Sequence, residues 1–143
     1  MPDEGNKLYY QIRLDVEEDL AKKIRKKISF DILPKLYEIL KKYNADLVCQ
    51  YDAFCNFLKE CELEKNIDNP LYRWTKDTVL NQSKKSKYLK SFTVYVNNEQ
   101  LYSKTVAEQI EKKLSDLNEK RIIKIHKFNS DPKNNPQPPK KYF

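Results

Sequence analysis

Hydrophobic and polar residues alternate in two stretches of the C-terminal half, on either side of a segment with helical spacing. Residues 91–97 alternate small or polar side chains with apolar ones, which is typical of a half-buried strand. Thr105 and Glu108 form a capping box, and apolar residues then recur with helical spacing through residues 105–117. Residues 121–128 show the pattern of a second strand. The sequence therefore predicts a strand–helix–strand unit.

The N-terminal part of the chain shows the same two kinds of pattern. Residues 8–14 alternate cleanly and predict a strand. Asp15, followed three residues later by Glu18, predicts a helix with apolar residues at positions 16, 20, 24 and 28. Pro34 lacks a backbone N–H, so it is expected to kink or end that helix. The helical period continues beyond it through Leu36, Ile39, Leu40 and Tyr43.

The middle of the chain allows two interpretations. Apolar residues between positions 47 and 61 recur at spacings of three and four, which predicts a helix. Residues 47–51 alone also fit a strand, and the element order then becomes β-α-β-β-α-β, the ferredoxin-like arrangement. Asn69-Pro70 predicts a further helix start. The residues expected to face inward from that helix are Leu71, Trp74 and Thr78.

Polar segments separate these elements. Residues 82–87 are basic and predict a connection without regular structure. Asn97-Asn98 suits a hairpin turn, because Asn tolerates positive φ, and residues 99–102 fit a short return strand. The fold class expected from all elements is α+β: a small three- or four-stranded sheet with several helices packed on one face. The ferredoxin-like arrangement is the alternative. Residues 1–128 form one domain in this interpretation, and the Pro- and Lys-rich residues 129–143 form a flexible tail.

Length and composition indicate one soluble globular domain. The 143 residues include no apolar run of the roughly 18 residues that a membrane span needs. The acidic N-terminus has no apolar segment, so we expect a cytoplasmic protein without a secretory signal or a membrane partner. The odd number of cysteines, at positions 49, 55 and 61, argues against disulfides and favours small buried side chains on a helix.

Several classes of active site are excluded or disfavoured. Phosphate-binding loops, dinucleotide fingerprints and nucleophile elbows need several glycines, and the chain has one, Gly5. No nucleotide cofactor is therefore expected. The single histidine, His126, excludes sites built on two histidines, and the cysteines lack the spacing of zinc ligands. We expect no catalytic residues, no metal and no other cofactor.

The charge is distributed unevenly. Residues 1–70 contain 12 basic and 14 acidic side chains, whereas residues 71–143 contain 16 basic and 7 acidic ones. This asymmetry suggests that the C-terminal half meets a polyanion or an acidic partner. Only four of the 28 basic residues are Arg, the residue that recognises phosphate and guanine in a bidentate manner. The charge therefore favours binding with low sequence specificity.

The alternation also predicts what each face of the sheet carries. The residues expected toward the helices are Leu8, Tyr10, Ile12, Leu14, Phe92, Val94, Val96, Ile123 and Ile125. The residues expected on the opposite face are Tyr9, Gln11, Arg13, Thr93, Tyr95, Lys124, His126 and Phe128. Aromatic rings among cations suit single-stranded nucleic acid, because rings stack on bases while cations neutralise phosphates.

The functional hypothesis is therefore a non-enzymatic module that binds nucleic acid through its basic C-terminal half, and we expect that nucleic acid to be single-stranded. The residues predicted to make the contacts are Tyr9, Arg13, Tyr95, Lys124 and His126, with Lys84, Lys85 and Lys87 assisting. The alternative is an adaptor or regulatory protein that works by protein–protein contact, including self-association, through the sheet face or the tail.

Overall fold

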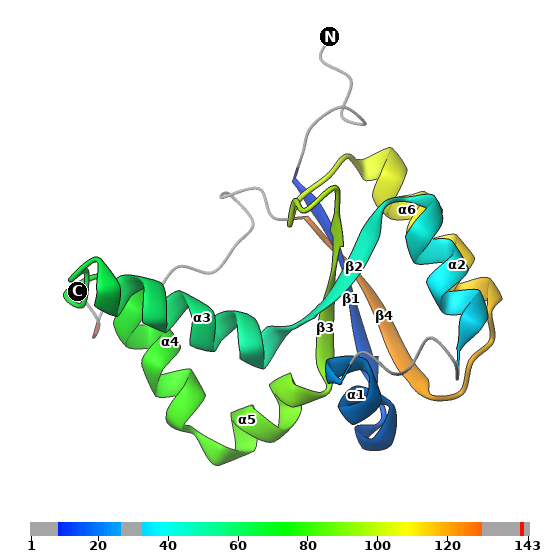
Figure 1. The fold of residues 1–143 in the computed structure, drawn as a ribbon. Helices are drawn as coiled ribbons and strands as arrows, with labels where there is room; N and C mark the ends of the chain where they lie inside the picture. Colours follow the sequence, from blue (N-terminus) through cyan, green and yellow to red (C-terminus); the bar gives the residue numbers. More distant parts are fainter. Residues whose placement is uncertain (1–8, 27–32, 130–140, 142–143) are drawn as a thin grey trace, which may run out of the picture.

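The computed structural model describes residues 9–26, 33–129 and 141 (Figure 1). In this part of the chain four strands form one antiparallel sheet in the order β2-β3-β1-β4. The strands are β1 (Tyr10–Val16), β2 (Ala45–Cys49), β3 (Ser91–Val96) and β4 (Ile122–Asn129). The predicted α+β class with a small three- or four-stranded sheet is confirmed, and the sheet has four strands.

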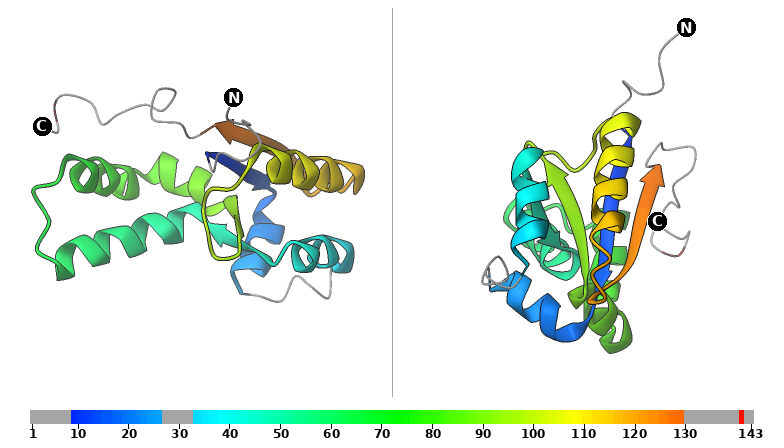
Figure 2. Two further views of the ribbon diagram at one scale, coloured as in Figure 1. Left: turned by 90° about the horizontal axis from the view of Figure 1, so that it is seen from above. Right: turned by 90° about the vertical axis from the view of Figure 1, so that its right-hand side faces the viewer.

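Six helices accompany the sheet within the described residues: α1 (Glu18–Arg25), α2 (Pro34–Lys42), α3 (Gln50–Leu63), α4 (Pro70–Leu80), α5 (Gln82–Leu89) and α6 (Lys104–Asp116). Figure 2 shows α2 and α6 on one side of the sheet, while α3, α4 and α5 extend away from it. We call these three helices, residues 50–89, the arm. No helix in the described ranges has the length and apolar character needed to cross a membrane.

The sheet has the ferredoxin-like topology that was the alternative expectation. The crossover through α1 and α2 joins β1 to β2, with β3 lying between them. The crossover through α6 joins β3 to β4, with β1 between them. Each half is thus a split β-α-β unit. The arm is an insertion between the neighbouring strands β2 and β3.

One apolar core lies between the sheet and helices α1, α2 and α6. Its strand residues are fully or nearly fully buried and come from alternate positions of β1 and β3: Ile12, Leu14, Val16, Phe92, Val94 and Val96. Its helix residues include Leu20, Ile24, Leu36, Leu40, Ala107, Ile110 and Leu114. The apolar residues that alternate along the strands therefore pack against the apolar residues that recur with helical spacing, as the sequence predicts.

The arm has a small core of its own. Leu58, Cys61 and Tyr72 are buried together, and Phe57 and Val79 pack against them. The base of the arm is fastened to the sheet: Gln50 Nε2 donates to Ser91 Oγ at 2.8 Å, and Cys49 Sγ lies 3.5 Å from the carbonyl oxygen of Tyr88. The arm is therefore a separate packing unit attached at one end of the sheet.

The segment after β3 lies between the ends of β1 and β3. Asn97 and Asn98 have φ of 53° and 65° and form the expected tight turn, since Val96 and Glu99 pair with each other beyond it. The chain then pairs Tyr102 with Tyr10 of β1. Residues 99–102 thus lie between β1 and β3, and these two strands separate above the Ile12–Val94 pair.

The hydroxyl group of Tyr102 bridges the strands where they separate. It accepts a hydrogen bond from the backbone N–H of Ile12 at 2.7 Å and donates one to the carbonyl oxygen of Val94 at 2.8 Å. All three residues are buried, and burial raises the pKa of Tyr102 to about 12. The hydroxyl group satisfies a donor and an acceptor that would otherwise lie unpaired in the core.

Of the two interpretations of this region, the strand is confirmed for residues 47–49, whereas the helix begins only at Gln50. β2 ends at Cys49, and α3 follows at Gln50 without a linker. Cys49 was expected on a helix but is buried at the end of the strand, whereas Cys61 is buried on α3. All three cysteines are free.

The expected helix starts need three corrections. Asp15 does not cap a helix, because β1 extends through Val16 and the N-cap of α1 is Glu17. Pro34 does not end a helix but begins α2, where its missing N–H costs no hydrogen bond. Thr105 is not a cap, because Ser103 Oγ accepts from the backbone N–H of Val106 and α6 begins at Lys104. Residues 8 and 28 lie outside the described part of the chain.

The basic segment 82–87 is helical rather than irregular. The side chain of Asn81 caps α5 by accepting from the backbone N–H of Lys84 at 3.1 Å, and Gln and Lys are good helix formers. On α4, Leu71 was expected to face inward but is 44% exposed. Tyr72 is buried instead, with its hydroxyl group 3.1 Å from Glu62 Oε1.

β4 contains one irregularity that changes a predicted face. Val16 pairs with Ile122 and Asp15 with Lys124, so Ile123 is the extra residue of a bulge. Ile123 was expected to face the helices but is 66% exposed. Ile125 pairs with Leu14 and is half-buried, as expected for the core side.

Candidate nucleic-acid interface

The face of the sheet opposite α1, α2 and α6, which we call the outer face, carries most of the predicted contact residues. Arg13 is paired with Thr93 on β3 and with His126 on β4, so the three side chains point to the same side. The same register places further side chains there: Gln11, Asp15, Asp46, Val48, Ser91, Tyr95, Lys124 and Phe128.

Arg13 lies near the middle of this face and is held by its neighbours. Its guanidinium carbon is 4.5 Å from the centre of the Phe128 ring, and its Nε donates to Gln11 Oε1 at 2.6 Å. Burial lowers the pKa of Arg13, and the nearby Tyr88 and Asp15 partly offset that effect. An arginine stacked on a ring presents an oriented plane that can contact a phosphate or a base.

His126 is oriented by an acid from the neighbouring strand. Its Nε2 lies 3.0 Å from Asp15 Oδ2, and its ring centre lies 5.5 Å from that of Phe128, with the planes inclined by 32°. Arg13, Phe128 and His126 therefore form a continuous group of cation and rings. Lys124, which pairs with Asp15, is exposed beside it.

A shallow hollow lies at the end of the outer face where β1 and β3 separate. It measures about 420 Å³ and is lined by Tyr95, Asn98, Glu99, Gln100 and Leu101. Tyr95 is half-buried, and burial raises its pKa. The carbonyl oxygen of Gln100 accepts from Gln11 Nε2 at 3.1 Å, which fixes the rim of the hollow against β1. A ring beside amide and carboxylate groups is a surface on which a nucleobase can stack.

The lysines of α5 lie over aromatic rings at the base of the arm. Lys85 Nζ is 5.4 Å from the centre of the Tyr51 ring, and Lys87 Nζ is 5.3 Å from that of Tyr88. Lys84 is exposed on the same helix. The carbonyl oxygen of Tyr88 accepts from Cys49 Sγ at 3.5 Å, so the last turn of α5 lies at the end of β2.

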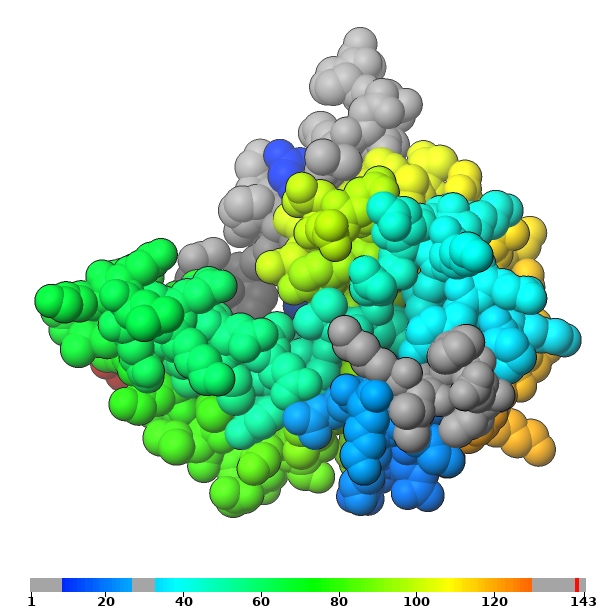
Figure 3. All heavy atoms as spheres, viewed as in Figure 1, coloured from blue at the N-terminus to red at the C-terminus, as the bar shows by residue number. Residues whose placement is uncertain are grey.

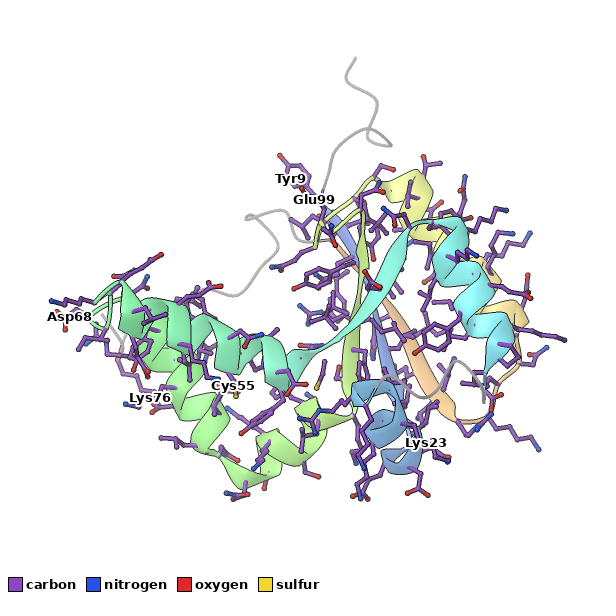
Figure 4. The ribbon with its side chains drawn as sticks, viewed as in Figure 1. Tyr9, Lys23, Cys55, Asp68, Lys76 and Glu99 are labelled. Atoms are coloured by element: carbon purple, nitrogen blue, oxygen red, sulfur yellow. The ribbon has the colours of Figure 1, made fainter. Side chains whose placement is uncertain are left out.

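The structure thus brings together Arg13, Tyr95, Lys124 and His126 but places the other predicted residues elsewhere. Tyr9 precedes β1 and is 36% exposed; Figure 4 shows it near Glu99 at one end of the sheet. The three α5 lysines belong to the arm rather than to the sheet. Gln11 and Thr93 are not displayed on the surface, being only 4% and 6% exposed.

These two residues are buried for different reasons. The side chain of Gln11 forms hydrogen bonds with the carbonyl oxygen of Gln100 and with Arg13, whereas Thr93 stands between its strand partners Arg13 and Val48.

Sequence reasoning missed Asp15 and Tyr88. Asp15 continues the alternation of Gln11 and Arg13, so the period of two places it on the outer face once the strand is extended to Val16. Tyr88 carries no such signal, because it follows a segment that was expected to be irregular. Its position depends on how α5 packs at the base of the arm.

The described residues offer no group of three or more His, Cys, Asp and Glu side chains that could hold a metal ion. Burial raises the pKa of Cys49, which favours the thiol over the reactive thiolate. Comparisons with protein-family models, curated proteins and solved structures find no match for this chain.

Proposed function

We propose that this protein binds single-stranded nucleic acid, with little sequence preference, across the outer face of its sheet. The observation that carries the proposal is the group formed by Arg13, Phe128 and His126, with Lys124 beside it and Tyr95 on the same face. Cations for the backbone and rings for the bases are thus held on one rigid sheet.

The rings provide a contact that every base can make. Phe128 is 37% exposed and Tyr95 is half-buried, so both can cover a base without leaving their strands. Base stacking on an aromatic side chain contributes about 1–3 kcal/mol per base and depends little on its identity. Low sequence preference follows from this mode of binding.

The α5 lysines extend the positive surface beyond the sheet. The last turn of α5 lies at the end of β2, so a strand that crosses the outer face can continue along Lys84, Lys85 and Lys87. Lysines act on phosphates as point charges, and their contribution falls as salt rises. Each phosphate neutralised on a single strand adds about 0.7 to the slope of log K against log salt.

Binding of fluorescent oligo(dT) and oligo(U), measured by anisotropy at several salt concentrations, tests this proposal. Tyr95→Ala is expected to weaken binding roughly 5- to 150-fold, corresponding to the loss of one stacked base. Replacing Lys84, Lys85 and Lys87 with Ala is expected to reduce the salt slope by up to about 2.

A matched control removes the same charge from the helical side of the molecule. Lys35, Lys41 and Lys112 lie on α2 and α6 and are exposed. Replacing these three with Ala should leave the salt slope nearly unchanged. Equal loss from the control and from the α5 variant means that net charge alone causes binding. No binding by the wild-type protein at low salt rejects the proposal and leaves the adaptor function in its place.

A further inference from the structure

The arm carries most of the exposed apolar surface of the described chain. In the described part of the chain seven large hydrophobic side chains are exposed. Four of them belong to the arm: Leu63, Ile67, Leu71 and Leu80. Leu63 is 84% exposed and Leu80 is 67% exposed. Figure 3 shows the arm projecting from the rest of the molecule, so these side chains are accessible to another protein.

Three of these residues form a patch at the tip of the arm, together with acids. Leu63 ends α3, Ile67 lies in the following loop, and Leu71 is in the first turn of α4. Four acids lie among them, Glu60, Glu62, Glu64 and Asp68, together with three cations, Lys59, Lys65 and Arg73. Arg73 donates a 3.0 Å hydrogen bond to the carbonyl oxygen of Asp68, so the acids outnumber the cations by one. Figure 4 shows Asp68 at the far end of the arm. The tip is therefore an apolar centre with an acidic surround on a chain of net charge +7.

The other patch lies at the junction of α4 and α5 and has the opposite charge. Leu80 is the last residue of α4, and Lys84, Lys85, Lys87 and Lys90 follow within ten residues with no acid among them. An apolar centre with a charged rim is the usual anatomy of a protein interface. The two patches are complementary in charge and alike in their apolar centres.

We propose that the acidic tip of one copy docks onto the basic α4–α5 junction of a second copy. Two tips would not pair with each other, because their acids repel. The same holds for two junctions, because their lysines repel. A tip against a junction joins opposite charges around apolar contacts, and complementarity of this kind selects the partner and its orientation.

The positions of the patches favour head-to-tail association. Leu71 and Leu80 are nine residues apart on α4, and at about 100° per residue they face opposite sides of that helix. A molecule whose two patches point in opposite directions offers one to each neighbour. Such heterologous contacts give rings or open chains instead of a symmetric pair.

Sedimentation of nucleic-acid-free protein over a wide range of concentrations tests this proposal by charge exchange. The tip variant carries Glu60→Lys and Glu64→Lys, which leaves intact the contact of Glu62 with Tyr72. The junction variant carries Lys84→Glu and Lys87→Glu. Wild type is expected to associate as concentration rises, and each variant alone is expected to remain monomeric. Mixing the two variants should restore association, because each then meets a patch of opposite charge.

Glu38→Lys on α2 is the control for a change of net charge and should associate like wild type. Circular dichroism verifies that each variant is folded. If a variant is unfolded, Leu63→Ser replaces the tip variant and Leu80→Ser the junction variant, each expected to weaken association.

A monomeric wild-type protein at every concentration overturns the proposal, as does a folded tip variant that still self-associates or a mixture that stays monomeric. Since Tyr95 has no part in this contact, loss of strand binding in Tyr95→Ala with normal self-association separates this proposal from the proposed function.

Discussion

Replacing Tyr102 with Phe removes one oxygen atom and leaves two buried backbone groups without partners. The hydroxyl group is bonded to the N–H of Ile12 and to the carbonyl oxygen of Val94, and both residues are 0% exposed. An unsatisfied buried donor or acceptor costs about 1–3 kcal/mol. Part of this cost is recovered if the strands close, so we expect a total loss of about 2–4 kcal/mol.

Urea unfolding followed by circular dichroism measures this loss directly. Stabilities of single domains are about 5–15 kcal/mol, so the expected change is large and lowers the transition midpoint without changing its slope. Tyr10→Phe is the matched control. The Tyr10 hydroxyl group accepts only a 3.4 Å hydrogen bond from Asn129 in an exposed position, and its loss should cost less than about 0.5 kcal/mol. Equal effects from the two substitutions would refute the bridging role of Tyr102.

The same hydroxyl group predicts a difference at high pH. Burial raises the pKa of Tyr102 to about 12, above its value in the unfolded chain. A raised folded-state pKa contributes stability that is complete below pH ~10 and is lost as the pH rises through ~12. The stability difference between wild type and Tyr102→Phe should therefore shrink over that window, by roughly 2–3 kcal/mol. A constant difference between about pH 9 and about pH 12 would contradict this reasoning.

Four further substitutions, at three positions, test local features of the fold. Asn98 has a φ of 65°, so Asn98→Gly should raise stability by about 0.5–1 kcal/mol and Asn98→Val should lower it, as seen in thermal melts. Asn81→Ala removes the cap of α5 and should cost about 1 kcal/mol. Amide exchange should become faster than in wild type in α5 but not in α6. Arg25→Ala breaks the 2.9 Å pair with Asp52, but both side chains are over a third exposed, so urea unfolding should show a loss below about 1 kcal/mol.

The strands near the chain ends could be predicted because one of their faces is buried and the other is not. Leu14 and Arg13 occupy opposite faces of β1, and this contrast is visible in the sequence. The bulge at Ile123 could not be predicted, because it depends on how β4 pairs with Asp15 and Val16. Sequence alternation therefore assigned the outer-face residues, while strand pairing determined which of them meet.

β2 was expected only as an alternative to a helix, and α5 was missed, for related reasons. β2 has five residues and passes directly into α3, so the apolar residues of the strand continue the three- and four-residue spacing of the helix. α5 is short, and its sequence has no apolar period of its own; packing against the rest of the arm and the Asn81 cap support it. Both elements rely on tertiary contacts more than on local sequence pattern.

The point at which the arm leaves the sheet makes the molecule modular. Cys49 pairs with Phe92, so the chain departs and returns at adjacent positions of two neighbouring strands. A short hairpin loop could span that gap, and a truncated protein without residues 51–89 is expected to keep the four-stranded architecture. This shortened protein would retain the aromatic residues of β3 and β4 but would lose both patches proposed for self-association.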